Sequence, residues 1–530
     1  MPGLRGRAAA RSALAGVARA ALLLLALGPA GAAAASASNG AWSFPSAPGL
    51  NPAIIEVPVP RPLAPSPGAI TGSVAGQTQA LQQAPGYILL APIKNFAHSG
   101  TLMGRPGPEI LEQNGNPIWS DPLGTVTIEG RRFEKVAMDF HATTYEGQPV
   151  LVWWEGHITP QGFGTGTWRI VDQHYHTIAV INAPPGFELD FHDIALTTHG
   201  TAYIIGNRTV AMSLRCCGGS SEGQIYDQVL FEVSIKTGRV VWGWDPLQHI
   251  PLRESYAAMP FHGPWDPYHI NSISFGPSGA PIISARNTWA AYWIDRKSLG
   301  IFATLGGKRS TFKLLGSARF AWQHDVLAQP GNQVSMFDDE AVPPVAQQSR
   351  GLVLGLDWTH HTASVAREYV LPKPALAGSQ GDFEPLPNGN VFVGWGQLPF
   401  FTEYSAGGAL LYMGNLPGPD ESYREFRAQW VGVPSEPPTL AIVPSKGATD
   451  IYASWNGATQ VAAWQLLAGS RATALTAVAK PVAREGFETL LPTTNAGPYY
   501  AVQALDPSGH VLASSHATRL PPPRTSTTHK

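Results

Sequence analysis

In the stretch Phe231-Glu-Val-Ser-Ile-Lys-Thr-Gly-Arg-Val-Val-Trp242, apolar and polar residues alternate up to Thr237-Gly238, and the apolar run Val240-Val-Trp242 follows the turn. Alternation with a period of two is typical of a half-buried strand, and a Thr-Gly pair between two strand-like runs indicates a tight hairpin turn. Similar strand, turn and strand patterns occur at 110–119, 292–302 and 383–393. The chain is therefore predicted to contain a series of antiparallel hairpins.

Hairpins that repeat every few tens of residues favour a β-propeller, because closing the sheets into a ring removes exposed sheet edges. The composition agrees: only 14% of the 530 residues are charged, and 56 Gly and 48 Pro suit short strands better than long helices. A β-sandwich with long insertions would also explain the hairpins, but not polar motifs that fall once per repeat. We therefore predict an all-β propeller over residues 85–435.

The remaining segments differ in amino-acid composition and in the spacing of their apolar residues. Residues 1–37 combine early arginines, a short apolar run and an Ala-x-Ala ending, which are the parts of a cleavable export signal. Residues 38–84 are rich in Pro, Ala, Ser and Gly and are predicted to form an arm or linker. Residues 440–518 show period-two strands that fit a small immunoglobulin or fibronectin-like sandwich, and 519–530 are predicted to be a disordered tail. The mature protein is expected to be secreted.

The only two cysteines are adjacent, Cys216-Cys217. Export permits a strained vicinal disulfide, and two free thiols or pairing between chains are also open. The sequence Asn207-Arg-Thr209 is a potential glycosylation site. The net charge of −2 gives no electrostatic case for nucleic acid or for an anionic membrane surface.

Four polar motifs in the middle of the chain contain residues suited to hold a tetrahedral anion. They are Asp190-Phe-His192-Asp193, His269-Ile-Asn271-Ser272, Ala285-Arg286-Asn287 and Trp322-Gln-His324-Asp325. Their key residues are separated by 77, 17 and 38 positions, which excludes a local loop or a single helix face. Only a fold that returns repeatedly to one axis can gather them, as a propeller does.

The residue types suggest how such a site would work. His324 is the best candidate nucleophile, with Asp325 expected to bias its tautomer. His269 and Asn271 are two apart on a presumed strand, so both are expected to face the same way. Arg286 offers a fork that suits a tetrahedral anion, and His192 completes the clamp or acts as general acid and base toward a phenol. Trp154, Trp289 and Trp322 are candidates for contact with an aryl group.

Metal binding is the rival chemistry, since three histidines with acidic neighbours can hold zinc or iron. Arg286 argues against it, because a fixed positive charge beside a cation is unfavourable. No P-loop, dinucleotide fingerprint or His-Glu-x-x-His motif is present. No cofactor and no metal are therefore expected.

The ordered motifs resemble the arylsulfotransferase family, in its actinobacterial and fungal branch of secreted proteins. The resemblance covers roughly residues 85–435 and rests on a set of segments: Val150-Leu-Val-Trp-Trp-Glu-Gly-His157, Leu189-Asp-Phe-His-Asp-Ile194, His269-Ile-Asn-Ser-Ile273, Ser284-Ala-Arg-Asn-Thr-Trp289, Trp322-Gln-His-Asp325 and Ser349-Arg-Gly-Leu-Val-Leu354. Phe337-Asp-Asp-Glu340 departs from the Phe-Asp-Asn of related chains.

The resemblance implies a six-bladed propeller that moves a sulfuryl group between phenols without an adenylyl-sulfate donor. It implies that His324 is transiently sulfated, that His269, Asn271 and Arg286 hold the sulfuryl oxygens, and that His192 takes the remaining histidine role. The partners would be an aryl sulfate donor and a phenolic acceptor. Two alternatives stay open: a non-catalytic propeller that binds glycans or cell-surface partners, and a metal- or quinone-dependent propeller enzyme.

Overall fold

The structure is a computed structural model that describes residues 42–53, 55–57, 82–95, 102, 104–418, 420–445, 448–493 and 497–520. The predicted signal peptide (1–37), most of the predicted arm and residues 521–530 lie outside the described residues. The described helices are short 3-10 turns: η1 (Arg215–Cys217), η2 (Pro246–Gln248), η3 (Leu252–Glu254) and η4 (Arg286–Thr288). Within the described ranges, no helix has the length and hydrophobicity that crossing a bilayer requires.

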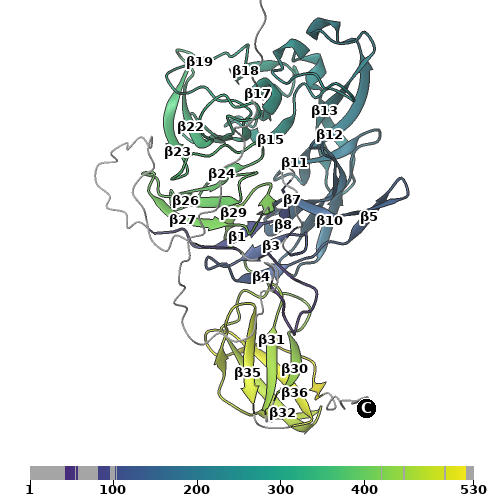
Figure 1. The fold of residues 1–530 in the computed structure, drawn as a ribbon, viewed down its shortest axis with the longest axis vertical. Coiled ribbons are helices and arrows are strands. Elements are labelled where there is room, and N and C mark those ends of the chain that lie inside the picture. The colour runs from purple at the N-terminus through teal and green to yellow at the C-terminus, as the bar shows by residue number, and fades with distance from the viewer. Residues whose placement is uncertain are drawn as a thin grey trace, which may run out of the picture. The chain divides into compact units, whose positions relative to one another are not determined.

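Six sheets of four or five strands form the blades of a propeller within the described residues (Figure 1). Blade 1 contains β29 (Phe426–Ala428), β1 (Tyr87–Leu90), β3 (Glu109–Leu111) and β4 (Pro117–Ser120). Blade 2 contains β7 (Val136–Tyr145), β8 (Gln148–Ile158), β9 (Gly164–Val171) and β10 (Thr177–Ile181). Blade 3 contains β11 (Glu188–Leu196), β12 (Thr201–Met212), β13 (Gly223–Ser234) and β14 (Val240–Trp244).

The other three blades follow the same order from the innermost strand outward. Blade 4 contains β15 (Ile270–Phe275), β16 (Pro281–Ala285), β17 (Ala290–Ile294) and β18 (Ile301–Gly306). Blade 5 contains β20 (His324–Gln329), β21 (Gln333–Asp338), β22 (Arg350–Asp357), β23 (Thr362–Tyr369) and an added parallel strand β19 (Lys313–Leu314). Blade 6 contains β24 (Asp382–Pro385), β25 (Val391–Gly394), β26 (Phe400–Tyr404) and β27 (Leu410–Asn415).

The ring closes by pairing its two ends. Strand β29 comes last in the propeller sequence yet pairs antiparallel with β1, the first strand, so both ends share blade 1 (Figure 1). A second pairing joins β2 (Pro92–Lys94) to β28 (Asp420–Ser422). Such closure removes two free sheet edges and ties together segments more than 300 residues apart. The predicted propeller is confirmed.

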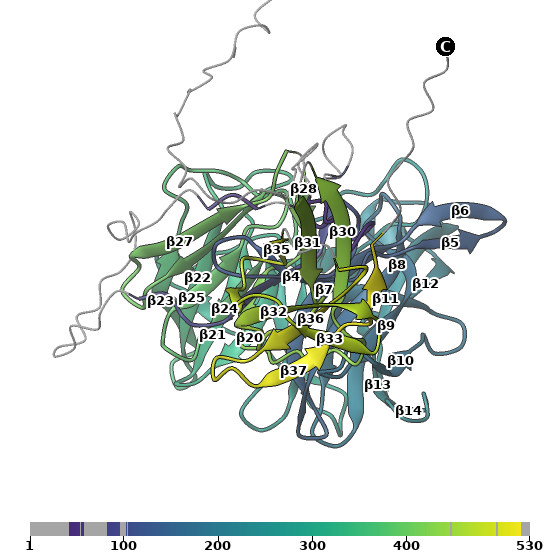
Figure 2. The ribbon, with the colours of Figure 1, turned by 90° about the horizontal axis from the view of Figure 1, so that it is seen from below.

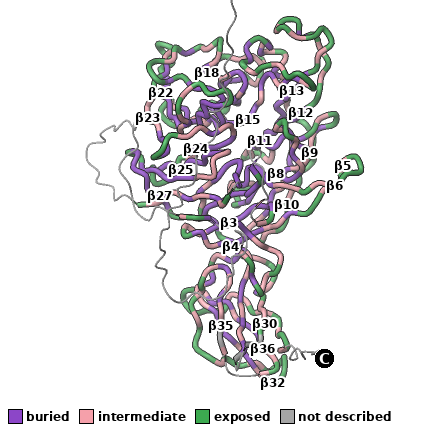
Figure 3. The backbone as a smooth tube through the Cα atoms, in the orientation of Figure 1, coloured by how far each residue is buried: buried purple, intermediate pink, exposed green. Residues whose placement is uncertain are grey.

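The innermost strands surround the axis, because neighbouring ones contact each other in order from β7 through β11, β15 and β20 to β24. The apolar core lies between blades: one buried cluster combines Trp154 and Trp168 of blade 2 with Phe191 and Ile204 of blade 3. Figure 3 shows the inner strands as buried, whereas the hairpin β5 (Thr125–Ile128) to β6 (Arg131–Glu134) is largely exposed. Polar residues on inner strands are thus placed in a dry interior.

Several inner strands are irregular at the motifs singled out in the sequence. The pairing register shifts between Leu189 and Ile194 in β11, between Ile270 and Ser272 in β15, and between His324 and Leu327 in β20. A β-bulge re-aims side chains and is frequent beside functional sites. Here the bulges set the directions of the histidine motifs.

Residues 439–519 form a second β unit. One sheet pairs β30 (Thr439–Ser445), β31 (Ala448–Ser454) and β35 (Glu488–Thr493). The other contains β33 (Ala474–Ala477), β32 (Ala463–Arg471), β36 (Tyr499–Leu505) and β37 (Val511–Ser514), with the short β34 (Val482–Ala483) and β38 (Thr518–Arg519) beside it (Figure 2). Ile451 and Leu491 from the first sheet share a core with Trp464 and Tyr500 from the second. Its assignment to the immunoglobulin or fibronectin class stays a prediction.

Cys216 and Cys217 lie in η1 as free thiols, with their Sγ atoms 2.8 Å apart.

Candidate active site

A cavity of about 350 Å³ opens at the axis of the propeller. His192, His269, Arg286 and His324 all line it, although they come from three different blades. Its size falls in the range of roughly 300–1,000 Å³ found for small-molecule sites. Four of the five residues predicted to be catalytic thus meet at one place.

His192 is fixed by a buried carboxylate. Its Nδ1 lies 2.7 Å from Asp190 Oδ1, and the same oxygen accepts the backbone N–H of His192. Asn207 donates its side-chain N–H to the other oxygen at 2.5 Å, so these donors keep the pKa of Asp190 below its ordinary value although burial acts to raise it. Burial lowers the pKa of His192, a shift that Asp190 opposes. Asn207 is buried and engaged here, which leaves its sequon unsuited to glycosylation.

His269 is held in the same manner from a different direction. It has a left-handed backbone with φ of 53°, and Asp266 accepts from both its backbone N–H (3.0 Å) and Nδ1 (2.6 Å). Its ring lies 4.6 Å from the ring of His192 in an edge-on arrangement. Its side chain is 14% exposed, against 3% for His192 and 1% for His324, so it lies nearest the opening.

His324 is the deepest of the three. Its Nδ1 lies 2.9 Å from Asp339 Oδ2, and the backbone N–H of Gln380 points at its Nε2 from 3.3 Å. Burial, followed by the charge of Arg286, lowers the pKa of His324 well below its ordinary value, so the ring is neutral at neutral pH. The expected partner, Asp325, does not contact the ring. The backbone turns at Asp325, which has φ of 53°, and its carboxylate accepts the N–H of Phe383 instead.

Arg286 presents a partly free guanidinium to the cavity. Nη2 donates to the carbonyl of Gly378 at 3.1 Å, Nη1 donates to Asn287 Oδ1 at 3.2 Å, and Nε has no hydrogen-bond partner among the described residues. The Trp322 ring lies 4.9 Å away and supports the cation. A buried guanidinium whose N–H groups are not all hydrogen-bonded is suited to bind an anion.

Asn271 does not line the cavity, although His269 does. The bulge between Ile270 and Ser272 breaks the alternation that the sequence argument assumed. Its side-chain nitrogen donates to the carbonyl of Gln323 at 2.7 Å, and Oδ1 is buried without a partner among the described residues. Asn271 therefore supports the backbone before His324.

The three predicted tryptophans are also placed behind the cavity wall. Trp154 is fully buried in the core between blades and donates to the carbonyl of Leu189. Trp289 stacks on Tyr256 at 3.7 Å, and Trp322 lies edge-on to Trp289 beneath Arg286. The apolar lining consists instead of Met138, Ile158, Phe191, Val342 and Tyr423.

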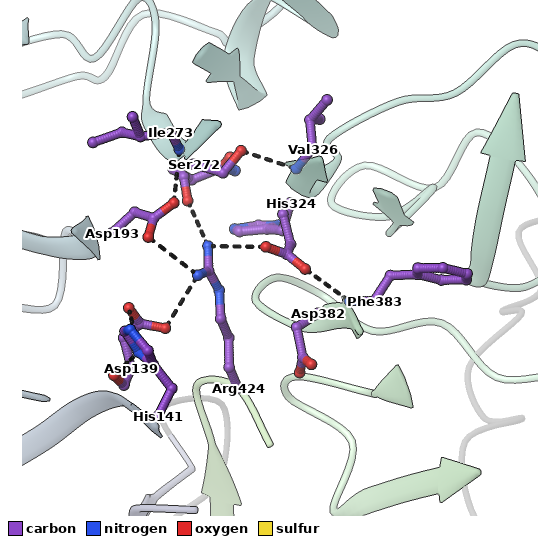
Figure 4. Close-up of polar contacts among 12 residues, drawn as sticks. Asp139, His141, Asp193, Ser272, Ile273, His324, Val326, Asp382, Phe383 and Arg424 are labelled. Carbon is purple, nitrogen blue, oxygen red and sulfur yellow. Dashed lines mark hydrogen bonds and ion pairs between the residues drawn. The ribbon is translucent and has the colours of Figure 1, made fainter. Parts of the chain in front are cut away.

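A second set of polar residues lies on the inner strands next to the cavity residues, and we call it the latch level: Asp139, Asp193, Ser272, Asp325 and Asp382. Figure 4 labels all of these except Asp325. Several of its members accept a backbone N–H from the following blade, with Ile273 bonded to Asp193 at 2.7 Å, Val326 to Ser272 at 2.9 Å and Phe383 to Asp325 at 2.8 Å.

Arg424 balances the charge of this level. Its guanidinium lies 3.1 Å from Asp139, 3.5 Å from Asp193 and 3.7 Å from Asp325, and donates to the carbonyl of Asn271 (Figure 4). One cation thus contacts carboxylates from three blades in a place closed to water.

Sequence reasoning missed the carboxylates behind the histidines. Asp190 and Asp266 precede their histidines by two and three residues, so a search for a nearby acid would have found them. Asp339 is recoverable only from the pairing of β20 with β21, where Phe337 faces His324. Tyr423 was missed because the strand that closes the ring had not been placed. In the described part of the chain, no three His, Cys, Asp or Glu side chains are arranged to hold one metal ion.

The fold and the site together define a β-propeller with an axial cavity lined by histidine and arginine. The family model for arylsulfotransferase (ASST) matches residues 141–414, more than half of the chain. The chain belongs to the arylsulfotransferase family, as its motifs predicted. Membership supports sulfuryl transfer in general, with small aryl compounds as substrates.

Comparison with curated proteins gives no match. Among solved structures, a protein of unknown function from Bacteroides caccae is 12% identical, with 64% of this chain and 98% of that chain covered and a TM-score of 0.38. An apocarotenoid oxygenase mutant from Synechocystis is 14% identical (61% and 70% covered, TM-score 0.33). A gluconolactonase from Xanthomonas campestris is 11% identical (68% and 100% covered, TM-score 0.32). These likenesses are too distant to bear on activity.

Proposed function

We propose that the protein is an exported aryl sulfate sulfotransferase that works through a sulfohistidine on His324. The observation that carries the proposal is the meeting of His324, Arg286, His192 and His269 at one small cavity. The pattern of early arginines, apolar run and Ala-x-Ala in residues 1–37 supports secretion. The sandwich of residues 440–518 is proposed to be an immunoglobulin or fibronectin-like appendage.

In the first half-reaction, His324 Nε2 attacks the sulfur of an aryl sulfate. The N–S bond forms, the bond from sulfur to the aryl oxygen breaks, and the phenol leaves with a proton supplied by His192 or His269. Arg286 meets charge that develops on the sulfuryl oxygens. In the second half-reaction a phenol gives its proton back to the same histidine, and its oxygen takes the sulfuryl group from Nε2.

The lining fits an aryl group beside an anion. Phe191, Tyr423, Met138 and Val342 offer apolar surface, while Arg286 supplies positive charge. The neutral His324 expected from its lowered pKa keeps a lone pair for attack at neutral pH. Nucleotide donors would need a phosphate cradle, and the sequence contains none of the usual motifs.

The test is peptide mass analysis after mixing the protein with 4-nitrophenyl sulfate. We expect a sulfuryl adduct on His324 that disappears when a phenol is added, and no adduct in His324→Ala. The matched control is His360→Ala: His360 also pairs Nδ1 with a carboxylate, Asp357, at 2.7 Å, but its side chain is 75% exposed. Full activity in His324→Ala would eliminate the mechanism, and loss of activity on chelation would favour a metal enzyme.

A further inference from the structure

The protonation of His324 can be deduced from its two neighbours. The backbone N–H of Gln380 can only donate, and it is directed at Nε2 from 3.3 Å. Nε2 must therefore carry the lone pair, which places the proton of the neutral ring on Nδ1. The hydrogen bond to Asp339 Oδ2 at 2.9 Å then runs from the imidazole to the carboxylate.

Asp339 is fixed for this contact. It follows directly after β21, and its backbone carbonyl accepts a hydrogen bond from Ser349 Oγ at 2.5 Å. The residue is completely buried, and its Oδ1 has no hydrogen-bond partner in the described part of the chain. Asp139 and Asp382 at the latch level also keep one oxygen without a partner among the described residues, so what distinguishes Asp339 is its direct hydrogen bond to a histidine of the cavity.

We infer that Asp339 is a positioning residue that holds the Nδ1–H of His324 and so directs the Nε2 lone pair toward the incoming sulfur. The inference rests on the proposed function and deepens it. When Nε2 bonds to sulfur, Nδ1 keeps its proton and the ring becomes cationic. Burial raises the pKa of Asp339 well above its ordinary value, and the charge of Arg286 opposes that shift. A cationic ring one hydrogen bond away favours the ionised carboxylate, whose charge then offsets that of the ring in a buried place where bulk water cannot.

The charged and titratable groups around His324 come from several elements. They are Asp339 after β21, Arg286 after β16, His269 before β15, His192 on β11 and Arg424 before β29. Asp339 is the group that contacts the ring through a hydrogen bond, whereas the others act through space. Removing it should therefore change the hydrogen bonding of Nδ1 as well as the rate.

The experiment compares Asp339→Ala and Asp339→Asn with the wild-type chain in single-turnover sulfation by 4-nitrophenyl sulfate, across pH. Asp339→Ala should slow adduct formation about 10²–10⁴-fold, with little change in the donor concentration that gives half the maximal rate. Asp339→Asn can still accept the Nδ1–H through its amide oxygen but lacks the charge. It should keep part of the rate, with the acid limb of its pH profile moved to lower pH. Asp357→Ala, which breaks the matched exposed pair with His360, should change neither quantity.

Nitrogen NMR of the ring provides a readout that does not depend on turnover. Wild-type His324 should have its proton on Nδ1, and Asp339→Ala should shift the Nδ1 resonance, because that N–H loses its acceptor while the N–H of Gln380 still faces Nε2. Adduct formation in Asp339→Ala at the wild-type rate, or an unchanged Nδ1 resonance there, would overturn the inference. A wild-type protein that shows the Nδ1–H tautomer but forms no adduct would refute the proposed chemistry and leave the pairing supported.

Discussion

The two levels of the propeller axis use neighbouring residues for different purposes. His192 faces the cavity while Asp193 joins blade 3 to blade 4, and His324 faces the cavity while Asp325 joins blade 5 to blade 6. Each motif therefore combines a reactive side chain with the bond that fixes its blade. The histidines are held in place because the residues beside them are part of the ring's structure.

Each level also has its own arginine, and the two differ in what surrounds them. Arg424 contacts three carboxylates and is almost fully buried. Arg286 binds a carbonyl and an amide and faces the cavity with an open donor. The first is compensated in the resting protein, whereas the second is available to a ligand.

The largest effect is expected for Arg424→Met, which leaves three buried carboxylates without their cation. Breaking a buried charge pair costs about 3–5 kcal/mol, so unfolding by denaturant should show a loss of that size. Arg169→Met is the control, because its side chain is 32% exposed and lies 3.5 Å from Glu155. It should lose less than about 1 kcal/mol. If both variants lost the same free energy of unfolding, Arg424 would contribute no more to stability than a partly exposed arginine does.

The next effect concerns turnover rather than stability. Arg286→Gln should lower kcat about 10²–10³-fold, since a donor to developing negative charge is removed. Its unfolding free energy should change less than that of Arg424→Met, because Arg286 makes no direct ion pair and acts on Asp339 only through space. Steady-state kinetics with an aryl sulfate, beside the same denaturant experiment, measures both. A variant that turns over normally would show that Arg286 has no part in binding the anion.

The sequence sufficed for what depends on local patterns. Alternation around Asn-Gly and Thr-Gly turns predicted the hairpins, and recurrence of polar motifs predicted that His192, His269, Arg286 and His324 share one axis. Prediction from the sequence failed where a β-bulge changes the direction of a side chain, as at Asn271. It also failed where both faces of a strand are covered. Strand β8 is such a case: Trp153 and Trp154 belong to different buried clusters, so both faces of the strand are covered. Asp339 depended on cross-strand register, which no local pattern records.

The two levels should also respond oppositely to pH. Burial raises the pKa of Asp193 from 3.8 to about 7, despite Arg424. Its folded state thus holds the proton more tightly than the unfolded state, so its contribution to stability is complete below 3.8 and is lost as pH rises toward 7. The pKa of His324 is lowered from 6.5, so its contribution is present above 6.5 and is lost as pH falls below that value.

Denaturant unfolding from pH 4 to 8 should separate these contributions. Asp193→Asn should lessen the loss of stability toward pH 7, and His324→Gln should lessen the loss on the acid side. For a group that exchanges one proton, the unfolding free energy changes by at most about 1.4 kcal/mol per pH unit. The measured quantity is the difference between variant and wild type at each pH, which cancels groups that titrate alike in both. Slopes of the same sign in the two variants would contradict the opposite burial effects described here.

The smallest effect tests a single latch. Ser272 is the one uncharged member of that level, and its Oγ accepts the N–H of Val326 at 2.9 Å. Ser272→Ala leaves this buried N–H without a partner, which costs about 1–3 kcal/mol, and adds no charge to the axis. Because Val326 lies two residues after His324, loosening this bond frees the start of β20 and should also reduce the rate of His324 sulfation. If the latch level served stability alone, Ser272→Ala would lower the unfolding free energy while sulfation kept its wild-type rate. A parallel loss in both measurements would show that joining the blades and aiming the histidine depend on the same hydrogen bond.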